Sequence, residues 1–322
     1  MITESKIKLW SKLGSRATFG QSMLSLPEIN EDAIAMSADL GNSSGLAPFI
    51  RKYPEKFINV GIAEQNMIGV ASGLAKEGFT PYVTSFAPFL SMRASEQIRM
   101  ELGYMQFNVR VVALGSGLAM AFLGNSHYGL EDVAVMRSIP NITIISPADC
   151  AEIFKVVHAT SDFKGPVYIR LTGGVNNPIV NTKDYEYEIG KSITLKNGDD
   201  VSIIATGSMV AKAIDAANIL SKKGISAEII NMHTIKPLDK MKLNEIISQN
   251  KKIISIEEHT VIGGLGSAIA EYLCECEAQI PLKIIGLEDK FGKTASYEHL
   301  LQIHGLTGDS IADKVENFLE QT

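Results

Sequence analysis

Short runs of β-branched and other apolar residues alternate with longer amphipathic segments along most of the chain. In the first half, the runs that we predict to be buried strands are residues 33–36, 57–60, 81–85, 109–114, 142–146 and 167–171. The segments between these runs have the length and the pattern of helices. Strands that alternate with helices favour mainly parallel sheets with helices on both faces.

A stretch rich in turn residues interrupts this pattern at residues 172–178, and a polar segment follows at 181–187. The alternation resumes in four further predicted strands, residues 201–206, 227–231, 253–257 and 282–286. A chain of 322 residues is longer than one core usually needs. We therefore predict an α/β protein of two domains, residues 1–180 and 188–322, each with a mainly parallel sheet flanked by helices.

Composition narrows the class of function. The net charge is -6 and the lysines are dispersed, which argues against a nucleic-acid partner. No apolar stretch reaches transmembrane length, and the N-terminus lacks the pattern of a secretory signal. With only three cysteines in the chain, these features predict a cytoplasmic, reduced protein that is not bound to a membrane and acts on small molecules.

Two local motifs invite functional interpretations that the spacing does not favour. Cys274 and Cys276 have no matching cysteine or histidine pair, so we expect helix packing rather than zinc binding. The run Gly264-Leu-Gly266 resembles part of a dinucleotide-binding loop, but Ile269 stands where a third small residue is needed. We expect these glycines to permit close packing at a helix start.

Glu64 is the strongest candidate for chemistry. It lies in the run Val60-Gly-Ile-Ala-Glu64-Gln-Asn-Met67, where a predicted strand turns into a helix of apolar and small residues. A carboxylate there is expected to be buried. An unpaired buried carboxylate is costly, so such a residue is usually either paired or kept for proton chemistry.

The run around Glu64 resembles the pyrimidine-domain signature of transketolases and their thiamine-diphosphate relatives. The resemblance extends over nearly the whole chain in the expected order. It includes Ser15-Arg16, Met36-Ser-Ala-Asp39-Leu40, Thr84-Ser-Phe86-Ala-Pro-Phe89, His127-Tyr-Gly-Leu-Glu131, Gly165-Pro-Val-Tyr-Ile-Arg170, Ile204-Ala-Thr-Gly-Ser208 and Glu257-Glu-His259-Thr.

The resemblance implies that the cofactor is thiamine diphosphate. In the family a glutamate bonds a ring nitrogen of the aminopyrimidine and favours its imino tautomer, and Glu64 matches that glutamate. Phe86 and Phe89 match aromatic residues that line the pyrimidine pocket, while Met92 stands where a third aromatic residue is usual. Asp39 and Leu40 match residues beside the cofactor.

On the substrate side, the resemblance assigns His127, Arg16 and Ser43 to sugar binding, with His127 also a catalytic residue. Other family positions differ. Leu123 replaces an aspartate that contacts a substrate hydroxyl, Gly115 replaces a phosphate-contacting histidine, and the segment around Gly173 lacks a phosphate-binding arginine, with Arg170 three residues away. Charge-assisted bonds to phosphate are strong, so their loss predicts an unusual substrate, either sulfonated or unphosphorylated.

The family also binds Mg²⁺ through a Gly-Asp-Gly motif of an N-terminal domain that this sequence lacks. The nearest match, Asn197-Gly-Asp-Asp200, precedes a predicted strand of the second domain and is interpreted as a turn. The resemblance therefore implies a C-terminal subunit that transfers a two-carbon ketol unit. Its N-terminal transketolase partner would ligate Mg²⁺ and bind the diphosphate, in an α₂β₂ heterotetramer.

Three alternatives remain open at this stage. A β subunit of a 2-oxo acid dehydrogenase shares the two-domain plan, and a deoxyxylulose-phosphate synthase shares the region around His127. A noncatalytic paralogue that only regulates a partner is the third. Cofactor binding and activity would separate these classes.

Overall fold

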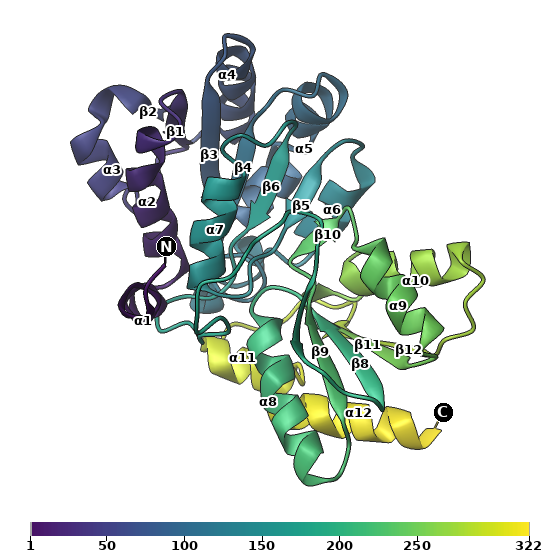
Figure 1. The fold of residues 1–322 in the computed structure, drawn as a ribbon. Helices are drawn as coiled ribbons and strands as arrows, with labels where there is room; N and C mark the ends of the chain where they lie inside the picture. Colours follow the sequence, from purple (N-terminus) through teal and green to yellow (C-terminus); the bar gives the residue numbers. More distant parts are fainter. Residues whose placement is uncertain (1, 322) are drawn as a thin grey trace.

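The computed structural model describes residues 2–321, which form two mainly parallel sheets with helices on both faces (Figure 1). The predicted fold class is confirmed. The strands are β1 Ala33–Ser37, β2 Phe57–Asn59, β3 Thr80–Phe86, β4 Arg110–Leu114, β5 Thr143–Ile145, β6 Val167–Arg170, β7 Ile193–Lys196, β8 Val201–Ala205, β9 Ala227–Asn231, β10 Thr234–Lys236, β11 Lys252–Thr260 and β12 Leu282–Leu287. The α-helices are α1 Glu4–Leu13, α2 Ser15–Ser25, α3 Ala47–Lys52, α4 Glu64–Lys76, α5 Ser95–Gln97, α6 Asp132–Ser138, α7 Cys150–Ala159, α8 Met209–Lys222, α9 Lys240–Ser248, α10 Leu265–Glu275, α11 Tyr297–Ile303 and α12 Gly308–Gln321.

The first sheet has the strand order β10-β5-β6-β4-β3-β1-β2. All neighbours in it are parallel except β10, which is antiparallel to β5. The register pairs Phe86 at the end of β3 with Leu114 at the end of β4. The carboxyl ends of β1, β2, β3, β4 and β6 therefore meet at one edge of the sheet, which is where ligands of parallel sheets usually bind.

Alternating side chains of the first sheet enter two different cores, as strand geometry requires. Val112 of β4 packs with Phe19 of α2 and Val156 of α7 on one face. Its neighbour Val111 packs with residues of α4 and α6, including Met67, on the other face.

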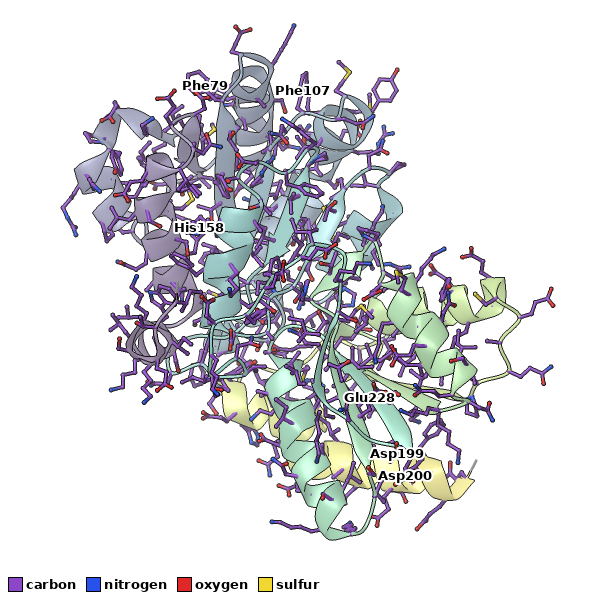
Figure 2. All side chains as sticks on the ribbon, in the orientation of Figure 1. Phe79, Phe107, His158, Asp199, Asp200 and Glu228 are labelled. Atoms are coloured by element: carbon purple, nitrogen blue, oxygen red, sulfur yellow. The ribbon has the colours of Figure 1, made fainter. Side chains whose placement is uncertain are left out.

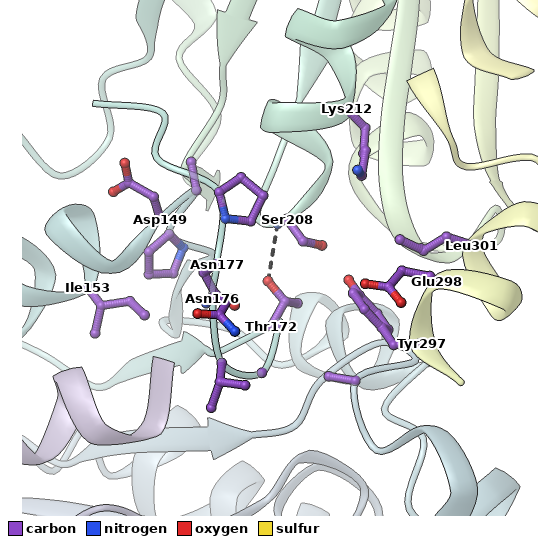
Figure 3. Close-up of a pocket in the computed structure, with 17 residues that line it drawn as sticks. Asp149, Ile153, Thr172, Asn176, Asn177, Ser208, Lys212, Tyr297, Glu298 and Leu301 are labelled. Carbon is purple, nitrogen blue, oxygen red and sulfur yellow. Dashed lines mark hydrogen bonds between the residues drawn. The ribbon is translucent and has the colours of Figure 1, made fainter. Parts of the chain in front are cut away.

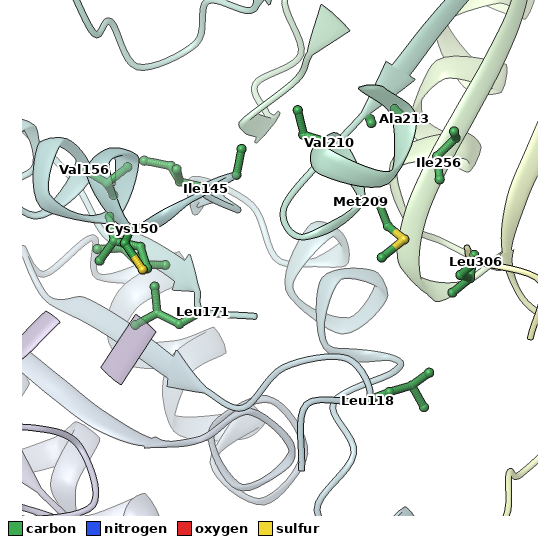
Figure 4. Packing of buried hydrophobic residues seen from close by; sticks show 14 of the residues in the cluster. Leu118, Ile145, Cys150, Val156, Leu171, Met209, Val210, Ala213, Ile256 and Leu306 are labelled. Carbon is green, nitrogen blue, oxygen red and sulfur yellow. The ribbon is translucent and has the colours of Figure 1, made fainter. Parts of the chain in front are cut away.

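The second sheet has the order β12-β11-β8-β9-β7, and only β7 is antiparallel to its neighbour. Helices α8 and α12 pack together on one face, whereas Leu243 of α9 and Ile269 of α10 cover Ile204 on the other. The core on the α8 side is continuous with that of the first domain. It joins Ile145 and Leu171 to Met209 and Ile256 (Figure 4).

All ten predicted strands are present, and two short strands were missed. β7 and β10 are four and three residues long and lie at sheet edges. An edge strand can form with a weak apolar pattern, so the sequence gives little sign of it. β10 belongs by position to the second predicted domain but pairs with β5 of the first sheet. The boundaries at residues 180 and 188 stay a prediction.

The structure also corrects one interpretation and supports another. Cys274 and Cys276 are exposed near the end of α10, so their assignment to helix packing was wrong. At Gly264 a Cβ would lie 2.0 Å from the Glu257 carboxylate, which accepts bonds from the first amides of α10, so close packing does require this glycine. Within residues 2–321, no helix is both long and apolar enough to cross a membrane.

A buried polar cluster joins the two domains. The Glu152 carboxylate of α7 accepts hydrogen bonds from Tyr185 and Asn231, and Tyr187 bonds and packs against His233. Burial raises the pKa of Glu152 and lowers the pKa of His233 to about 4. His233 is therefore neutral in the folded protein at neutral pH.

His233 should make the protein less stable in mild acid. Its pKa is about 4 when folded and about 6.5 when unfolded, so the unfolded state binds more protons below pH 6.5 and the stability falls as the pH falls towards 4. Between pH 6.5 and 5 the expected loss is up to ~2 kcal/mol. Because the raised pKa of Glu152 acts in the opposite direction in both proteins, we expect urea unfolding to show a loss that is larger by this amount in the wild type than in His233→Gln. An equal acid dependence of both proteins would contradict the prediction.

Candidate active site

The turn between β2 and α4 brings Glu64 to the carboxyl edge of the first sheet. Asn59, the last residue of β2, accepts hydrogen bonds from the backbone amides of Gly61 and Asp39 at 3.1 and 3.0 Å. Gly61 has a φ of 71°, a conformation that favours glycine. The side chain of Asn59 also donates to the Asp39 carboxylate at 3.2 Å, so the turn is tied to the loop after β1. Sequence reasoning missed Asn59.

Glu64 is the first residue of α4, and its side chain is only 2% exposed. One carboxylate oxygen accepts a hydrogen bond from the hydroxyl of Ser85 at 3.1 Å. The other accepts a hydrogen bond from the guanidinium of Arg93 at 2.7 Å. The predicted burial is therefore observed, and the carboxylate is paired. Sequence reasoning identified neither of these two partners.

Three aromatic rings lie beside Ser85 and Arg93, the two partners of the Glu64 carboxylate. Phe86 ends β3, Phe89 begins a π-helical turn at Phe89–Arg93, and His127 follows a 3₁₀ segment. The ring centroids of Phe86 and Phe89 are 5.9 Å apart, and His127 lies 5.6 and 5.3 Å from them. Nδ1 of His127 shares a hydrogen bond with the hydroxyl of Ser126 at 2.9 Å. The predicted histidine and aromatic residues thus form one cluster.

Four exposed apolar side chains lie close in sequence to the residues of this cluster. Met92, the third predicted pocket residue, is 55% exposed in the same turn as Phe89. Ile62 is 78% exposed two residues before Glu64, and Phe122 and Leu123 are exposed shortly before His127. Exposed large apolar side chains near a candidate site are compatible with its being covered by another protein.

The remaining predicted residues lie on neighbouring loops. Asp39 is exposed with a φ of 59°, and Leu40 is half-buried against the main core. Arg16 of α2 donates to the backbone carbonyl of Ser43 at 3.4 Å, so these two predicted substrate residues form a separate pair. The hydroxyl of Ser15 binds the carbonyl of Gly173, which brings the start of α2 to the loop after β6.

The positions that differ from the family have structural consequences. Gly115 has a φ of 62°, and a Cβ there would lie 2.3 Å from the sulfur of Met120. Met120 therefore fills the space that a side chain at position 115 would need. Gly173 also has a positive φ, 77°, and a Cβ there would lie 2.7 Å from the side chain of Asn177.

Arg170, which lies three residues from the expected phosphate-binding position, is part of the core. Its guanidinium donates to both oxygens of Asp132 at 3.0 and 2.9 Å and to the carbonyls of Gly129 and Glu258. Both charged side chains are 1% exposed. Arg170 is thus committed to holding the loop near His127 and is not directed at a ligand.

Glu258 of the second domain supports the same loop, a role that sequence reasoning missed. Its carboxylate accepts bonds from the backbone amide of Leu118 at 2.6 Å, from the hydroxyl of Tyr297 at 2.6 Å and from Ser208. Burial raises the pKa of Glu258. Its neighbour His259 accepts from the amide of Ala134, so it lies at the contact between the two domains.

A cavity of about 330 Å³ is lined by residues of both domains (Figure 3). Thr172 and Ser208, joined by a hydrogen bond, line it with Lys212 and Tyr297. Gly173, one of the positions that differ from the family, lines the cavity. None of the predicted cofactor-binding residues does. The Glu64 cluster is therefore not part of this enclosed space.

No group of three or more histidine, cysteine or acidic residues within the described residues 2–321 is arranged to hold a metal ion. The segment 197–200 forms the connection from β7 to β8, where Asp200 accepts from the amide of Ser226. Asp199 and Asp200 lie at the end of the second sheet that is remote from the first sheet (Figure 2). They are thus far from the carboxyl edge that bears Glu64.

Two family models match the chain. The model described as transketolase, pyrimidine binding domain, matches residues 11–175, and the model described as transketolase, C-terminal domain, matches residues 190–311. A structural neighbour described as "Split gene transketolase, inactive beta4 tetramer" has a TM-score of 0.86 and is 39% identical. That match covers 95% of this chain and 99% of the neighbour.

Two curated relatives are similar along nearly their whole length. The "Putative transketolase C-terminal section" of Methanocaldococcus jannaschii is 40% identical over 304 residues, which is 94% of this chain and 95% of the relative. The "6-deoxy-6-sulfo-D-fructose transketolase subunit" of Clostridium sp. (strain MSTE9) is 36% identical over 308 residues, 95% of this chain and 94% of the relative. The resemblance predicted from the motifs is confirmed, and the chain belongs to the transketolase family.

Proposed function

We propose that this chain is the C-terminal subunit of a split transketolase that moves a two-carbon ketol unit from a ketose to an aldose. The observation that carries the proposal is the buried carboxylate of Glu64 beside the rings of Phe86 and Phe89 and the side chain of His127. The relatives named as a transketolase section and a transketolase subunit support it.

The side chains around Glu64 fit the aminopyrimidine of thiamine diphosphate. A buried carboxylate provides an acceptor for a ring N–H, and Phe86, Phe89 and Met92 provide an apolar wall for a flat ring. When bound, the cofactor would supply the nucleophilic carbon that receives the ketol unit. Glu64 would hold the ring nitrogen and share its proton, while Asp39 and Leu40 would lie beside the ring at the subunit interface.

His127 and the pair Arg16–Ser43 would bind the sugar. Arg16 could pair with an anionic group on the substrate, because a guanidinium forms two parallel bonds to phosphate or sulfonate oxygens. Met120 fills the space at Gly115, and Leu123 is apolar and exposed, so the pocket has fewer polar groups for a phosphorylated sugar. We infer a sulfonated or unphosphorylated substrate, and the similarity to a sulfofructose transketolase subunit supports this inference.

The other half of the site would come from an N-terminal transketolase subunit. That subunit would bind the diphosphate and ligate Mg²⁺, because this chain offers no metal-binding group near Glu64 within residues 2–321. The exposed Ile62, Met92 and Phe122 would be covered at the contact, in an α₂β₂ assembly. The description of a similar split transketolase as an inactive β4 tetramer supports a requirement for the partner. A cytoplasmic location belongs to the same proposal, and three cysteines without a disulfide support it.

The test is ketol transfer by the chain and its co-purified partner, with thiamine diphosphate and Mg²⁺, across phosphorylated, sulfonated and neutral ketoses. We expect transfer to require both subunits and to be faster with a sulfonated or neutral donor than with a phosphorylated one. Decarboxylation of a 2-oxo acid would favour the dehydrogenase alternative, and formation of a deoxyketose phosphate from pyruvate would favour the synthase. A complex that binds no cofactor would favour the noncatalytic paralogue.

A further inference from the structure

Arg93 makes two contacts with the residues that define the cofactor pocket. One guanidinium nitrogen lies 2.7 Å from the carboxylate of Glu64, and the central carbon of the guanidinium lies 4.2 Å from the ring centroid of Phe89. Phe89 and Arg93 are four residues apart in one π-helical turn, which brings both side chains to the same face. Neither comparison nor motif assigns Arg93 a role.

These two contacts are the ones that an aminopyrimidine would need. A guanidinium is flat, carries N–H donors and stacks on aromatic rings. An aminopyrimidine protonated at its ring nitrogen is also flat and presents an N–H donor. Arg93 lies over the ring of Phe89 and donates to one Glu64 oxygen, and Ser85 donates to the other oxygen, so a second flat donor that makes the same two contacts has to take the place of Arg93.

We propose that Arg93 is a displaceable stand-in for the aminopyrimidine, which occupies its contacts until the cofactor binds. This inference depends on the proposed function. Glu64 is 2% exposed and would be costly to leave unpaired in a subunit without cofactor. Arg93 is 46% exposed, so its charge can return to water by rotation of the side chain. The arginine thus keeps the empty pocket stable and competes with the cofactor.

The consequence is measurable as cofactor affinity. Arg93→Met keeps the length and the apolar stem of the side chain but removes the competing cation. We expect the complex with its partner to bind thiamine diphosphate about fivefold to tenfold more tightly in this variant, because one partly buried charged hydrogen bond no longer has to be broken. Isothermal titration with thiamine diphosphate at fixed Mg²⁺ measures the change.

Two variants sharpen this test. Arg99→Met removes an exposed arginine that pairs with Glu96. This control variant should leave the affinity for thiamine diphosphate within twofold of the wild type. Arg93→Lys keeps the charge without the flat group, and its affinity should lie between those of the wild type and Arg93→Met. Without cofactor, the isolated Arg93→Met chain should melt at a lower temperature than the Arg99→Met chain.

The opposite results would overturn the inference. Weaker binding by Arg93→Met would show that the arginine stays beside the bound cofactor and helps to hold it, and unchanged binding would show that it does not compete. In both cases the wild-type complex still binds, so the proposed function stands. A wild-type complex that binds no thiamine diphosphate would overturn both proposals.

Discussion

Glu64→Gln should abolish most ketol transfer by the reconstituted complex. Glutamine has nearly the same shape, its amide oxygen can accept the hydrogen bond from Arg93, and its amide nitrogen can donate to the hydroxyl oxygen of Ser85, so the fold should persist. It cannot take up and return a proton. The expected loss in kcat is ~10²–10⁴, the range for a positioned acid or base.

The matched control is Glu96→Gln. Glu96 is an exposed glutamate that lies on the short helix α5 and pairs with Arg99, so its charge is removed without touching the pocket. We expect full activity from this control. Steady-state rates with a saturating ketose and aldose, together with melting temperatures of both variants, make the comparison. If Glu64→Gln kept more than a tenth of the wild-type rate, Glu64 would not carry the proton chemistry.

Short sequence motifs predicted those site residues that can be recognised from their neighbours in the sequence. Phe86 ends β3 and Glu64 begins the helix after β2, and parallel strands bring such positions to one edge, whereas His127 lies in the connection between β4 and α6. The resemblance of these motifs to transketolases therefore indicated the residues, and the structure shows that Phe86 and His127 lie together beside the Ser85 partner of Glu64. The predicted binding roles of these residues and of Asp39, Leu40, Ser43 and Arg16 stay predictions.

The contacts that position those residues could not be predicted from short sequence motifs. Asn59, Ser85 and Arg93 reach Asp39 and Glu64 over 20 to 29 residues of sequence, and Glu258 reaches Leu118 over 140. Such pairs depend on how helices and loops pack after folding. Arg93 had a weak signal, since a residue four positions after Phe89 shares its face of a helix. The pairing of β10 with the first sheet had none, because three residues form it.

The pair Arg170–Asp132 is expected to have the largest effect on stability. It links β6 to α6 inside the protein, and Arg170 also binds the carbonyl of Glu258 from the second sheet. Removal of Arg170 leaves the buried Asp132 carboxylate with the hydrogen bond from the Tyr168 hydroxyl but without an opposite charge. Arg170→Met should therefore lower the free energy of unfolding by ~3–5 kcal/mol, compared with ~0–1 kcal/mol for Arg99→Met at an exposed pair.

Urea unfolding of the isolated chain measures this loss, and a double variant separates its cause. Asp132→Leu with Arg170→Met removes both charges and leaves apolar groups of similar size. If the unpaired carboxylate causes the loss, the double variant should be more stable than Arg170→Met alone. If the hydrogen bonds from Arg170 to Gly129 and Glu258 dominate instead, the double variant should be no more stable than the single one, because those carbonyls lose the same donor in both.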